Sequence, residues 1–245
     1  MANAEKRYLN GSLSLKNLLG SIKYKRDFRR ANPDYFDPEG LLVFCGPQGS
    51  GKTLSAVQYV KKILKEYPKA ILVTNISIND LPDSIEVHEY EGLDSLKKYE
   101  NGYNGVIYLI DEIHLEWNSL ESKNISIEEM IEFSQQRKQR KHIVGTSQVY
   151  GRLAKPLREQ IKNVVLCKNY FGLVQFNDLI DGFNTVEKDG TLETDSIKKY
   201  FWFHAPSLYK CYDTYAKMNR YKKEWQGHAR VNTLGGSNQW HLLKV

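Results

Sequence analysis

The segment that most constrains the fold of this chain is residues 41–58, LLVFCGPQGSGKTLSAVQ. Its apolar start, residues 41–44, has the length and composition of a buried strand. Residues 46–53, GPQGSGKT, fit the pattern G-x-x-x-x-G-K-[ST] without a mismatch, and apolar residues follow at helical spacing over 54–64. Because the pattern lies between a strand and a helix, it predicts a phosphate-binding loop, or P-loop.

Each residue type in this loop suits the binding of ATP. Glycine lets the backbone curl closely and direct its N–H groups toward an anion, and the helix that begins near Lys52 adds the positive end of its dipole. Lys52 brings a cation to the β- and γ-phosphates, and the Thr53 hydroxyl is placed to bind Mg²⁺. The alternative, a glycine-rich turn that binds nothing, is disfavoured because both residues are in register. The candidate nucleotide-binding residues are Gly46, Pro47, Gln48, Gly49, Ser50, Gly51, Lys52, Thr53 and Leu54.

A second informative segment is residues 106–112, VIYLIDE, in which five apolar residues precede two carboxylates. This is the pattern of a Walker B strand. Parallel strands deliver their carboxyl ends to the sheet edge at which the P-loop emerges. We therefore expect Asp111 to hold Mg²⁺, directly or through water, and Glu112 to orient and deprotonate the attacking water. A strand that is merely capped by a charged loop is the alternative, and the complete P-loop in the same chain disfavours it.

Two other classes of P-loop protein fit less well. The sequence contains no N-K-x-D element for guanine, so GTP is disfavoured. Residues 111–114, DEIH, match the box of DExH helicases, but that class needs two core domains and 245 residues leave room for one.

Composition places the chain among ordinary globular proteins, with 41% apolar and 26% charged residues. No apolar run approaches the length that crosses a bilayer, and the first residues lack the apolar region of a secretory signal. We therefore expect no transmembrane segment of its own. Cys45, Cys167 and Cys211 are odd in number and widely spaced, which favours buried thiols in a reducing cytoplasm over disulfides or zinc ligands.

The net charge of +6 is unevenly distributed along the chain. Basic residues cluster at 23–30, 137–141 and 217–223, and the first and last clusters are interleaved with aromatic residues. This pattern favours a phosphate-backbone partner, slightly, over plain solvated surface.

The rest of the sequence indicates an α/β core with β-rich and basic extensions. The expected divisions are a basic arm over 1–38, an ATPase core over 39–169, a β-rich extension over 170–215 and a basic tail over 216–245. The core should also contain strands at 70–75, 85–88, 141–148 and 164–167, and helices at 93–99, 126–140 and 156–160, the second of which starts with a capping box. The extension should form a meander of strands at 170–176, 184–188 and 199–204, with a hairpin turn at 189–190.

The arm has a weak helical pattern, carried by Leu13, Leu15, Leu18, Leu19 and Ile22. Its aromatic residues could cover the adenine of a nucleotide, although plain packing is the simpler reading; they are Tyr24, Phe28, Tyr35 and Phe36.

Four features together resemble the zonular occludens toxin (Zot)-like ATPases of phages, in the HerA/FtsK superfamily of DNA-pumping motors. They are GPQGSGKT, VIYLIDE, a basic helix end that leads into HIVGTSQ, and LYKCYDTY at 208–215. The resemblance covers roughly residues 40–215. It implies a three-layer α/β sandwich of the additional-strand, RecA/FtsK-like P-loop NTPase class, with a mostly parallel sheet and a small C-terminal β-rich appendage.

The resemblance also implies roles for further residues. Gln148, at the end of a strand, matches the position of a γ-phosphate sensor; read from the residues alone it is a loop residue. Arg158 is the preferred arginine that a neighbouring subunit inserts to stabilise developing charge, and Arg152, Arg137 and Arg140 are rivals. The implied assembly is a ring-shaped homo-oligomer, a hexamer or pentamer, that grips DNA through its backbone without reading the sequence.

The function expected from these features is an ATP-driven DNA translocase that packages a viral genome, in the host cytoplasm or at a virion vertex. Filamentous-phage relatives carry a transmembrane helix after the ATPase region, and this sequence has none, which favours packaging over extrusion. A membrane-associated assembly or secretion ATPase, with a portal or membrane protein as partner, is the first alternative. A P-loop kinase is the second, and the adjacent Asp111 and Glu112 disfavour it because they suit water activation.

Overall fold

The computed structural model describes residues 14–37, 40–118, 120, 126–183, 185–188 and 191–212. The chain divides into two units, residues 1–35 and 36–245. The described strands are β1 (Leu41–Cys45), β2 (Ile71–Thr74), β3 (Val87–Glu89), β4 (Val106–Ile110), β5 (Lys141–Ser147), β6 (Ile161–Tyr170), β7 (Val174–Asp181), β8 (Val186–Lys188), β9 (Thr191–Glu193) and β10 (Ser196–Phe203). The described α-helices are α2 (Leu15–Ala31), α3 (Lys52–Glu66), α4 (Asp94–Lys98), α5 (Ile127–Gln135), α6 (Lys155–Arg158) and α7 (Pro206–Tyr209).

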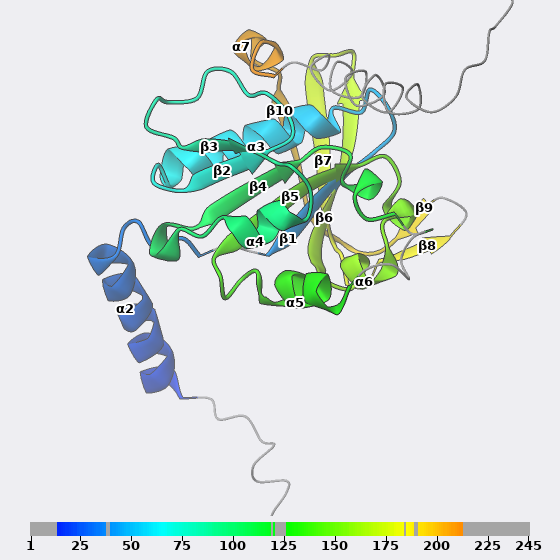
Figure 1. Cartoon of the computed structure of the whole chain (residues 1–245). Coiled ribbons are helices and arrows are strands. Elements are labelled where there is room, and N and C mark those ends of the chain that lie inside the picture. Colours follow the sequence, from blue (N-terminus) through cyan, green and yellow to red (C-terminus); the bar gives the residue numbers. More distant parts are fainter. Residues whose placement is uncertain are drawn as a thin grey trace, which may run out of the picture. The chain divides into compact units, whose positions relative to one another are not determined.

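The larger unit is built on one twisted sheet, whose described strands run in the order β10-β7-β6-β1-β5-β4-β2-β3 (Figure 1). The strands from β6 to β3 are parallel, and β7 and β10 join antiparallel at one end. Strand β5 lies between the P-loop strand β1 and the acid-bearing strand β4. This inserted strand confirms the additional-strand class, and the mostly parallel sheet confirms the predicted α/β fold.

The sheet is covered on both faces, which gives three layers. Strands β1 and β4 are buried along their whole length, because parallel strands with helices on both sides expose neither face. On one face α3 packs its buried residues, among them Val57 and Val60, against Phe44 and Leu109. On the other face α5 and α6 contribute Phe133 and Leu157, which pack with Val43 and Tyr108.

Local signals define the start of α5 but not its end. Ser126 and Glu129 form the predicted capping box, in which each side chain accepts a hydrogen bond from the other's backbone N–H. The helix expected over 126–140 ends at Gln135, however. The Arg140 backbone takes a left-handed φ of 56°, and its guanidinium donates to the carbonyl of Phe36 at 2.7 Å. The helix therefore ends five residues before its predicted end, and residues 136–140 form a turn that leads into β5 at Lys141.

The β-rich extension differs from the meander that the sequence predicts. Strand β7 runs over 174–181 instead of 170–176, and β7 and β10 pair with each other and extend the main sheet. Strands β8 and β9 form a separate two-stranded ribbon. The predicted turn at 189–190 lies outside the described residues, between these two strands. The hairpin of β6 and β7 spans residue 170, at which the sequence divides core from extension, so the extension is continuous with the core sheet.

The predicted burial of the cysteine side chains is confirmed, because Cys45, Cys167 and Cys211 are all buried. Cys211 lies where the described chain ends, beside an antiparallel bridge between Tyr212 and Ile78. The last three residues of the LYKCYDTY segment, 213–215, and the predicted basic tail lie outside the described residues. No helix in the described part of the chain is long and apolar enough to cross a membrane.

Candidate nucleotide-binding and hydrolysis site

The P-loop turns tightly between β1 and α3. Gly51 is the N-cap of α3 and has a left-handed backbone, with φ of 78°. A β-carbon at this position would lie 2.1 Å from Oε1 of Gln175, so both the backbone and the space require glycine. At the base of the loop, the backbone N–H of Gly46 donates to the carbonyl of Ser147 at 3.3 Å. The crest of the loop, residues 47–49, is exposed and therefore accessible to a ligand.

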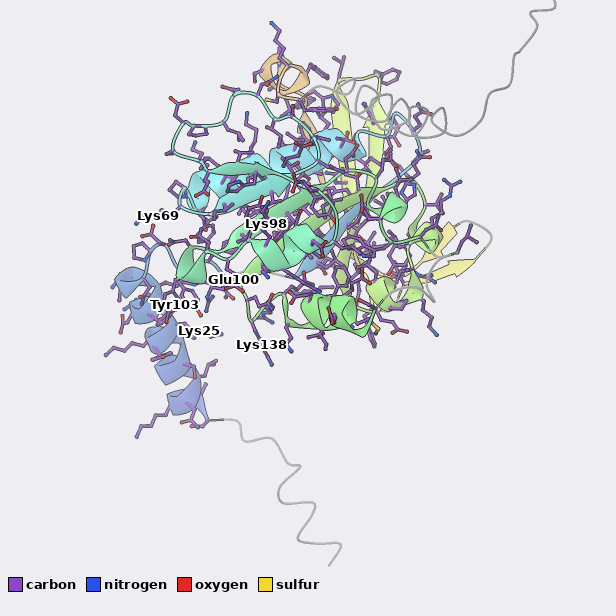
Figure 2. All side chains as sticks on the ribbon, viewed as in Figure 1. Lys25, Lys69, Lys98, Glu100, Tyr103 and Lys138 are labelled. Carbon is purple, nitrogen blue, oxygen red and sulfur yellow. The ribbon has the colours of Figure 1, made fainter. Side chains whose placement is uncertain are left out.

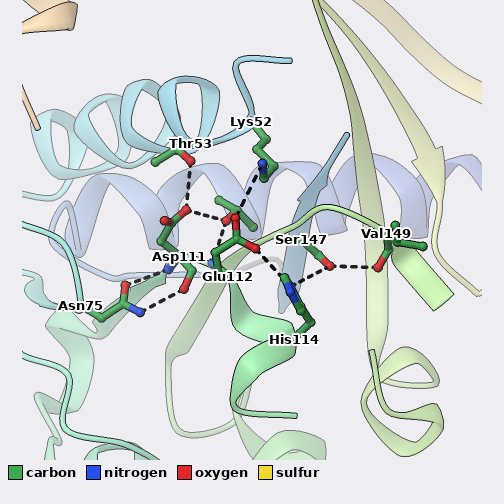
Figure 3. Close-up of polar contacts among 9 residues, drawn as sticks. Lys52, Thr53, Asn75, Asp111, Glu112, His114, Ser147 and Val149 are labelled. Carbon is green, nitrogen blue, oxygen red and sulfur yellow. Dashed lines mark hydrogen bonds and ion pairs between the residues drawn. The ribbon is translucent and has the colours of Figure 1, made fainter. Parts of the chain in front are cut away.

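The two acids at the end of β4 face this loop, as the sequence predicts (Figure 3). The Thr53 hydroxyl donates to Oδ1 of Asp111 at 2.9 Å. The Lys52 ammonium lies 3.7 Å from Oε1 of Glu112, and the exposed fractions of the two side chains are 8% and 20%. The ammonium and the hydroxyl at the start of α3 and the two carboxylates after β4 therefore converge at one edge of the sheet.

Asp111 is held on several sides. Asn75, which follows β2, accepts a hydrogen bond from the Asp111 N–H at 2.8 Å and donates to its carbonyl at 3.0 Å. The buried hydroxyl of Thr146, near the end of β5, donates to the Asp111 carboxylate at 2.6 Å. These contacts fix both the backbone and the side chain of Asp111, so the carboxylate is oriented toward Thr53.

Glu112 takes a left-handed backbone with φ of 55°, which is uncommon for a residue with a side chain. Its N–H donates to Oγ1 of Thr146 at 2.9 Å, and this hydrogen bond supports the turn. The carboxylate lies between Lys52 on Oε1 and the buried His114, whose Nδ1 is 3.3 Å from Oε2. Ser147 extends this row of polar contacts, since its hydroxyl lies 3.3 Å from the same Nδ1 and donates to the carbonyl of Val149 (Figure 3).

The antiparallel hairpin supports the P-loop from beneath. The Gln175 amide on β7 donates to the carbonyl of Ser50 at 2.9 Å and to Oδ1 of Asn177 at 3.0 Å. The Asn177 side chain in turn hydrogen-bonds the Ser55 hydroxyl of α3. Gln175 is fully buried and Asn177 is 3% exposed. Buried amides are costly unless they are hydrogen-bonded, so these two residues are committed to holding the loop.

The sulfur of Cys167 adjoins this network. Burial raises the pKa of the Cys167 thiol to about 12, against the opposing effects of a hydrogen bond with Ser55 and of the Lys52 charge. The thiol is therefore neutral at physiological pH. The backbone carbonyl oxygen of Cys167 lies 2.8 Å from the position that a β-carbon on Gly46 would occupy, so β6 also limits the loop sterically.

The residues fit a triphosphate and Mg²⁺. The Ser50 hydroxyl is buried with no hydrogen-bond partner among the described residues, and Lys52 is only 7% exposed at the base of the loop. Both are groups that an anion would satisfy. Thr53 and Asp111 offer oxygen atoms, the donors that Mg²⁺ prefers, and substrate phosphates usually complete such a site.

The residues predicted at the rim of the site are spread around it. Gln148 directly follows β5 and is exposed at the same sheet edge. Arg158 is half-buried, with its guanidinium over the ring of Tyr150 at 5.9 Å. Arg137 and Arg152 are exposed. Arg140 binds the Phe36 carbonyl and lies over the ring of Tyr103, at the opposite ends of β4 and β5 from the acids.

The aromatic residues proposed for adenine contacts fall in different units. Phe36 is 2% exposed and packs against Tyr67 at 5.1 Å between ring centroids, so it has a core role. Phe28 packs against Tyr24 and Tyr35 within the first unit. Tyr103, which the Arg140 guanidinium covers, lies on the surface of the second unit with Lys98 and Glu100 (Figure 2).

Several residues of the site were not predicted from sequence. Asn75 could have been, because it follows a parallel strand at the edge where the acids lie. His114 lies two residues after Glu112, but only the turn after β4 brings its ring back to the carboxylate. Gln175 and Asn177 carried no local signal, since their role depends on how β7 packs beneath the loop.

The chain is similar to known proteins in sequence and in fold. Residues 41–219, well over half of the chain, match the family model described as zonular occludens toxin (Zot). The solved N-terminal domain of zonular occludens toxin from Neisseria meningitidis is similar in fold, with a TM-score of 0.50 and 15% identity over 71% of this chain and 98% of that one. The genome packaging NTPase B204 from Sulfolobus turreted icosahedral virus 2, in complex with ATP-gammaS, matches with a TM-score of 0.46 and 14% identity over 69% of this chain and 98% of that one. No curated protein matches the sequence.

Proposed function

The chain belongs to the zonular occludens toxin family, and from this premise we propose that it hydrolyses ATP and couples hydrolysis to the movement of DNA. The observation that carries the proposal is the convergence of Lys52 and Thr53 on the two acids of β4, at 3.7 Å and 2.9 Å. A P-loop without such acids could bind phosphate but would have no group to activate water.

The residues divide the work of hydrolysis among them. The loop amides and Lys52 bind the phosphates, and Thr53 and Asp111 are the candidate Mg²⁺ ligands. Bound Mg²⁺ and ATP would supply the transferable phosphoryl group and the positive charge that neutralises it. Glu112 orients the attacking water and accepts its proton, and the contact with Lys52 keeps the carboxylate directed toward the phosphates. Gln148, exposed at the same edge, is the candidate sensor of the γ-phosphate.

A second cation from a neighbouring subunit would complete the site. Within the chain, the Lys52 ammonium contacts the acid pair, 3.7 Å from Oε1 of Glu112. Phosphoryl transfer commonly gains a further stabilising arginine in trans. Sequence resemblance favours Arg158 for this role, whereas exposure favours Arg137 and Arg152, so all three are candidates within a ring-shaped homo-oligomer. Packaging of a viral genome is the activity that we favour for such a ring, in a host cytoplasm or at a virion vertex.

The decisive experiment measures ATP hydrolysis by the full chain with and without DNA at increasing salt. We expect double-stranded DNA to raise the rate and salt to abolish the increase, because contacts to the phosphate backbone release counterions. DNA-insensitive hydrolysis would reject the translocase and leave an ATPase for another task. Phosphate transfer to a metabolite would replace it with a kinase.

A mixing experiment identifies the trans arginine. Lys52→Ala subunits lack a working site of their own but retain their arginines, and an arginine→Ala variant has the reverse defect. Mixing the two restores part of the activity if that arginine acts across the interface. A pair that recovers nothing excludes that arginine as the trans group.

A further inference from the structure

Helix α2 (Leu15–Ala31), considered by itself, has an apolar stripe that its own unit does not bury. Leu15, Leu18, Leu19 and Ile22 recur at the spacing of one helix face. Their exposed fractions are 77%, 55%, 65% and 55%, and α2 has no buried residue. Ser14 caps the start of the helix, where its side chain accepts a hydrogen bond from the Asn17 N–H.

The same helix is strongly basic. Six basic side chains, Lys16, Lys23, Lys25, Arg26, Arg29 and Arg30, stand against one acid, Asp27, so the net charge of α2 is +5. Lys25 is among the side chains that project from α2 in Figure 2. A helix with this much charge and only 17 residues cannot cross a bilayer, but it can lie along one.

The charges continue the apolar stripe instead of opposing it. Arg26 and Arg29 lie four and seven residues after Ile22, which places them on the same face. At 100° per residue, Lys23 and Lys25 flank this face on either side. The opposite face carries mainly uncharged residues, which are Asn17, Gly20, Ser21, Tyr24, Phe28 and Ala31. One face therefore presents an aliphatic half followed by a cationic half, which we call the α2 face: Leu15, Leu18, Leu19, Ile22, Arg26 and Arg29.

We propose that the α2 face binds the surface of a membrane that contains anionic lipid. The four aliphatic side chains enter the boundary between headgroups and acyl chains, and the basic side chains bind the lipid phosphates. Charge complementarity alone would also fit DNA, but a DNA backbone offers no apolar surface for four leucine and isoleucine side chains. The proposal does not rest on the nucleotide site, because it is argued from the residues of α2 alone.

The test is flotation of the full chain with vesicles of phosphatidylglycerol and phosphatidylcholine, compared with vesicles of phosphatidylcholine alone. We expect binding to the anionic vesicles only, and weakening by salt. The double variant Leu18→Asp with Leu19→Asp should weaken binding by roughly a hundredfold or more, because it removes two aliphatic anchors and adds two negative charges.

The matched control is Asn17→Asp with Ser21→Asp, which adds the same charge to the opposite face. We expect this variant to lose about tenfold or less, and ATP hydrolysis to be unchanged in both variants. Equal losses in the two variants would overturn the proposal, because the apolar stripe would then contribute nothing. It would also be overturned if the wild-type chain failed to float with anionic vesicles, or if the leucine variant lost DNA binding but kept vesicle binding.

Discussion

The two halves of the central sheet contribute to the candidate site in different ways. The parallel half, β1, β5, β4 and β2, places Asp111 and Glu112 directly after β4, and Lys52 at the start of α3, after the loop that follows β1. The other half is β6, β7 and β10, and we call it the antiparallel half because β7 runs antiparallel to both of its neighbours. It contributes Gln175 and Asn177 from within β7. Residues that follow a strand can reach a ligand, whereas the buried side chains within β7 can only support the loop. The comparison therefore separates groups that perform the chemistry from groups that hold the loop.

The largest expected effect tests the parallel half. Replacing Glu112 with Gln removes the proton acceptor but keeps the size and the hydrogen-bonding capacity of the side chain. We expect ATP binding to persist and hydrolysis to fall by about 10²–10⁴-fold, the range for loss of a general base. Single-turnover hydrolysis and equilibrium binding of a fluorescent ATP analogue measure the two quantities separately. Lys52→Ala is the companion variant, and it should lose binding itself.

Undiminished hydrolysis in the Glu112→Gln variant would show that another group activates water. His114 would then be the first candidate, because its Nδ1 lies 3.3 Å from the same carboxylate.

The next largest effect tests the contact between the halves. Gly51→Ala would place a β-carbon 2.1 Å from Oε1 of Gln175 and would also strain a left-handed backbone. We expect nucleotide affinity to fall by about a hundredfold, because the clash with Gln175 and the strain in the backbone each distort the loop. Combining it with Gln175→Ala should restore part of that affinity, because the clash is relieved and only the backbone strain remains.

The double-mutant cycle makes this prediction specific. If the two changes are additive, the P-loop does not rest on Gln175 and the hairpin is only an extension of the sheet. Gln175→Ala alone is the control, and its circular dichroism and unfolding transition report whether the hairpin still folds.

Much of the parallel half could be predicted from sequence because its signals are local. In the P-loop and in the VIYLIDE segment, the functional residues lie within eight residues of the end of an apolar strand. Parallel topology then brings these strand ends together. The order of the strands came from the family resemblance and not from the residues, since nothing in residues 141–147 states that β5 inserts between β1 and β4.

The antiparallel half could not be predicted to the same depth. Residues 170–176 looked like a strand because of their apolar residues, but β6 extends through Tyr170 and the turn falls at 171–173. In the first half of β7 the buried positions are the polar Gln175 and Asn177, while Phe176 is 44% exposed; the apolar Ile180 is buried only near the end of the strand. Periodicity predicts that apolar residues form the inward face, so the rule fails for the first half of this strand. A buried polar network that supports a functional loop reverses the usual pattern, and only packing reveals it.

A smaller effect should separate the two kinds of support. Thr146→Val removes the hydroxyl that contacts the Asp111 carboxylate and the Glu112 N–H. We expect kcat to fall by about tenfold with KM nearly unchanged, because the acids lose orientation while the phosphate loop is intact. Gln175→Met should do the opposite, with KM raised several-fold and kcat little changed. Steady-state kinetics of both variants decide this, and the same pattern in both would erase the distinction between the halves.

The smallest effect concerns the pH dependence of the free energy of unfolding that the buried thiol of Cys167 causes. The pKa of Cys167 rises from an ordinary value of 9.0 to about 12 on burial. The neutral thiol is therefore favoured in the folded chain, and its contribution is complete below about pH 9. As pH rises from there toward 12, the unfolded chain ionises first and binds fewer protons, so the free energy of unfolding declines by up to about 1.4 kcal/mol per pH unit from this group.

Urea unfolding at pH 8 and pH 10 should show a smaller decline in Cys167→Ala than in the wild type, whatever the variant loses in absolute stability from its cavity. Cys211→Ala, at the end of the described chain, is the control for loss of a buried thiol elsewhere. Equal declines in the wild type and in Cys167→Ala would mean that the sulfur beneath the P-loop is hydrated, and that the hairpin does not seal the loop from water.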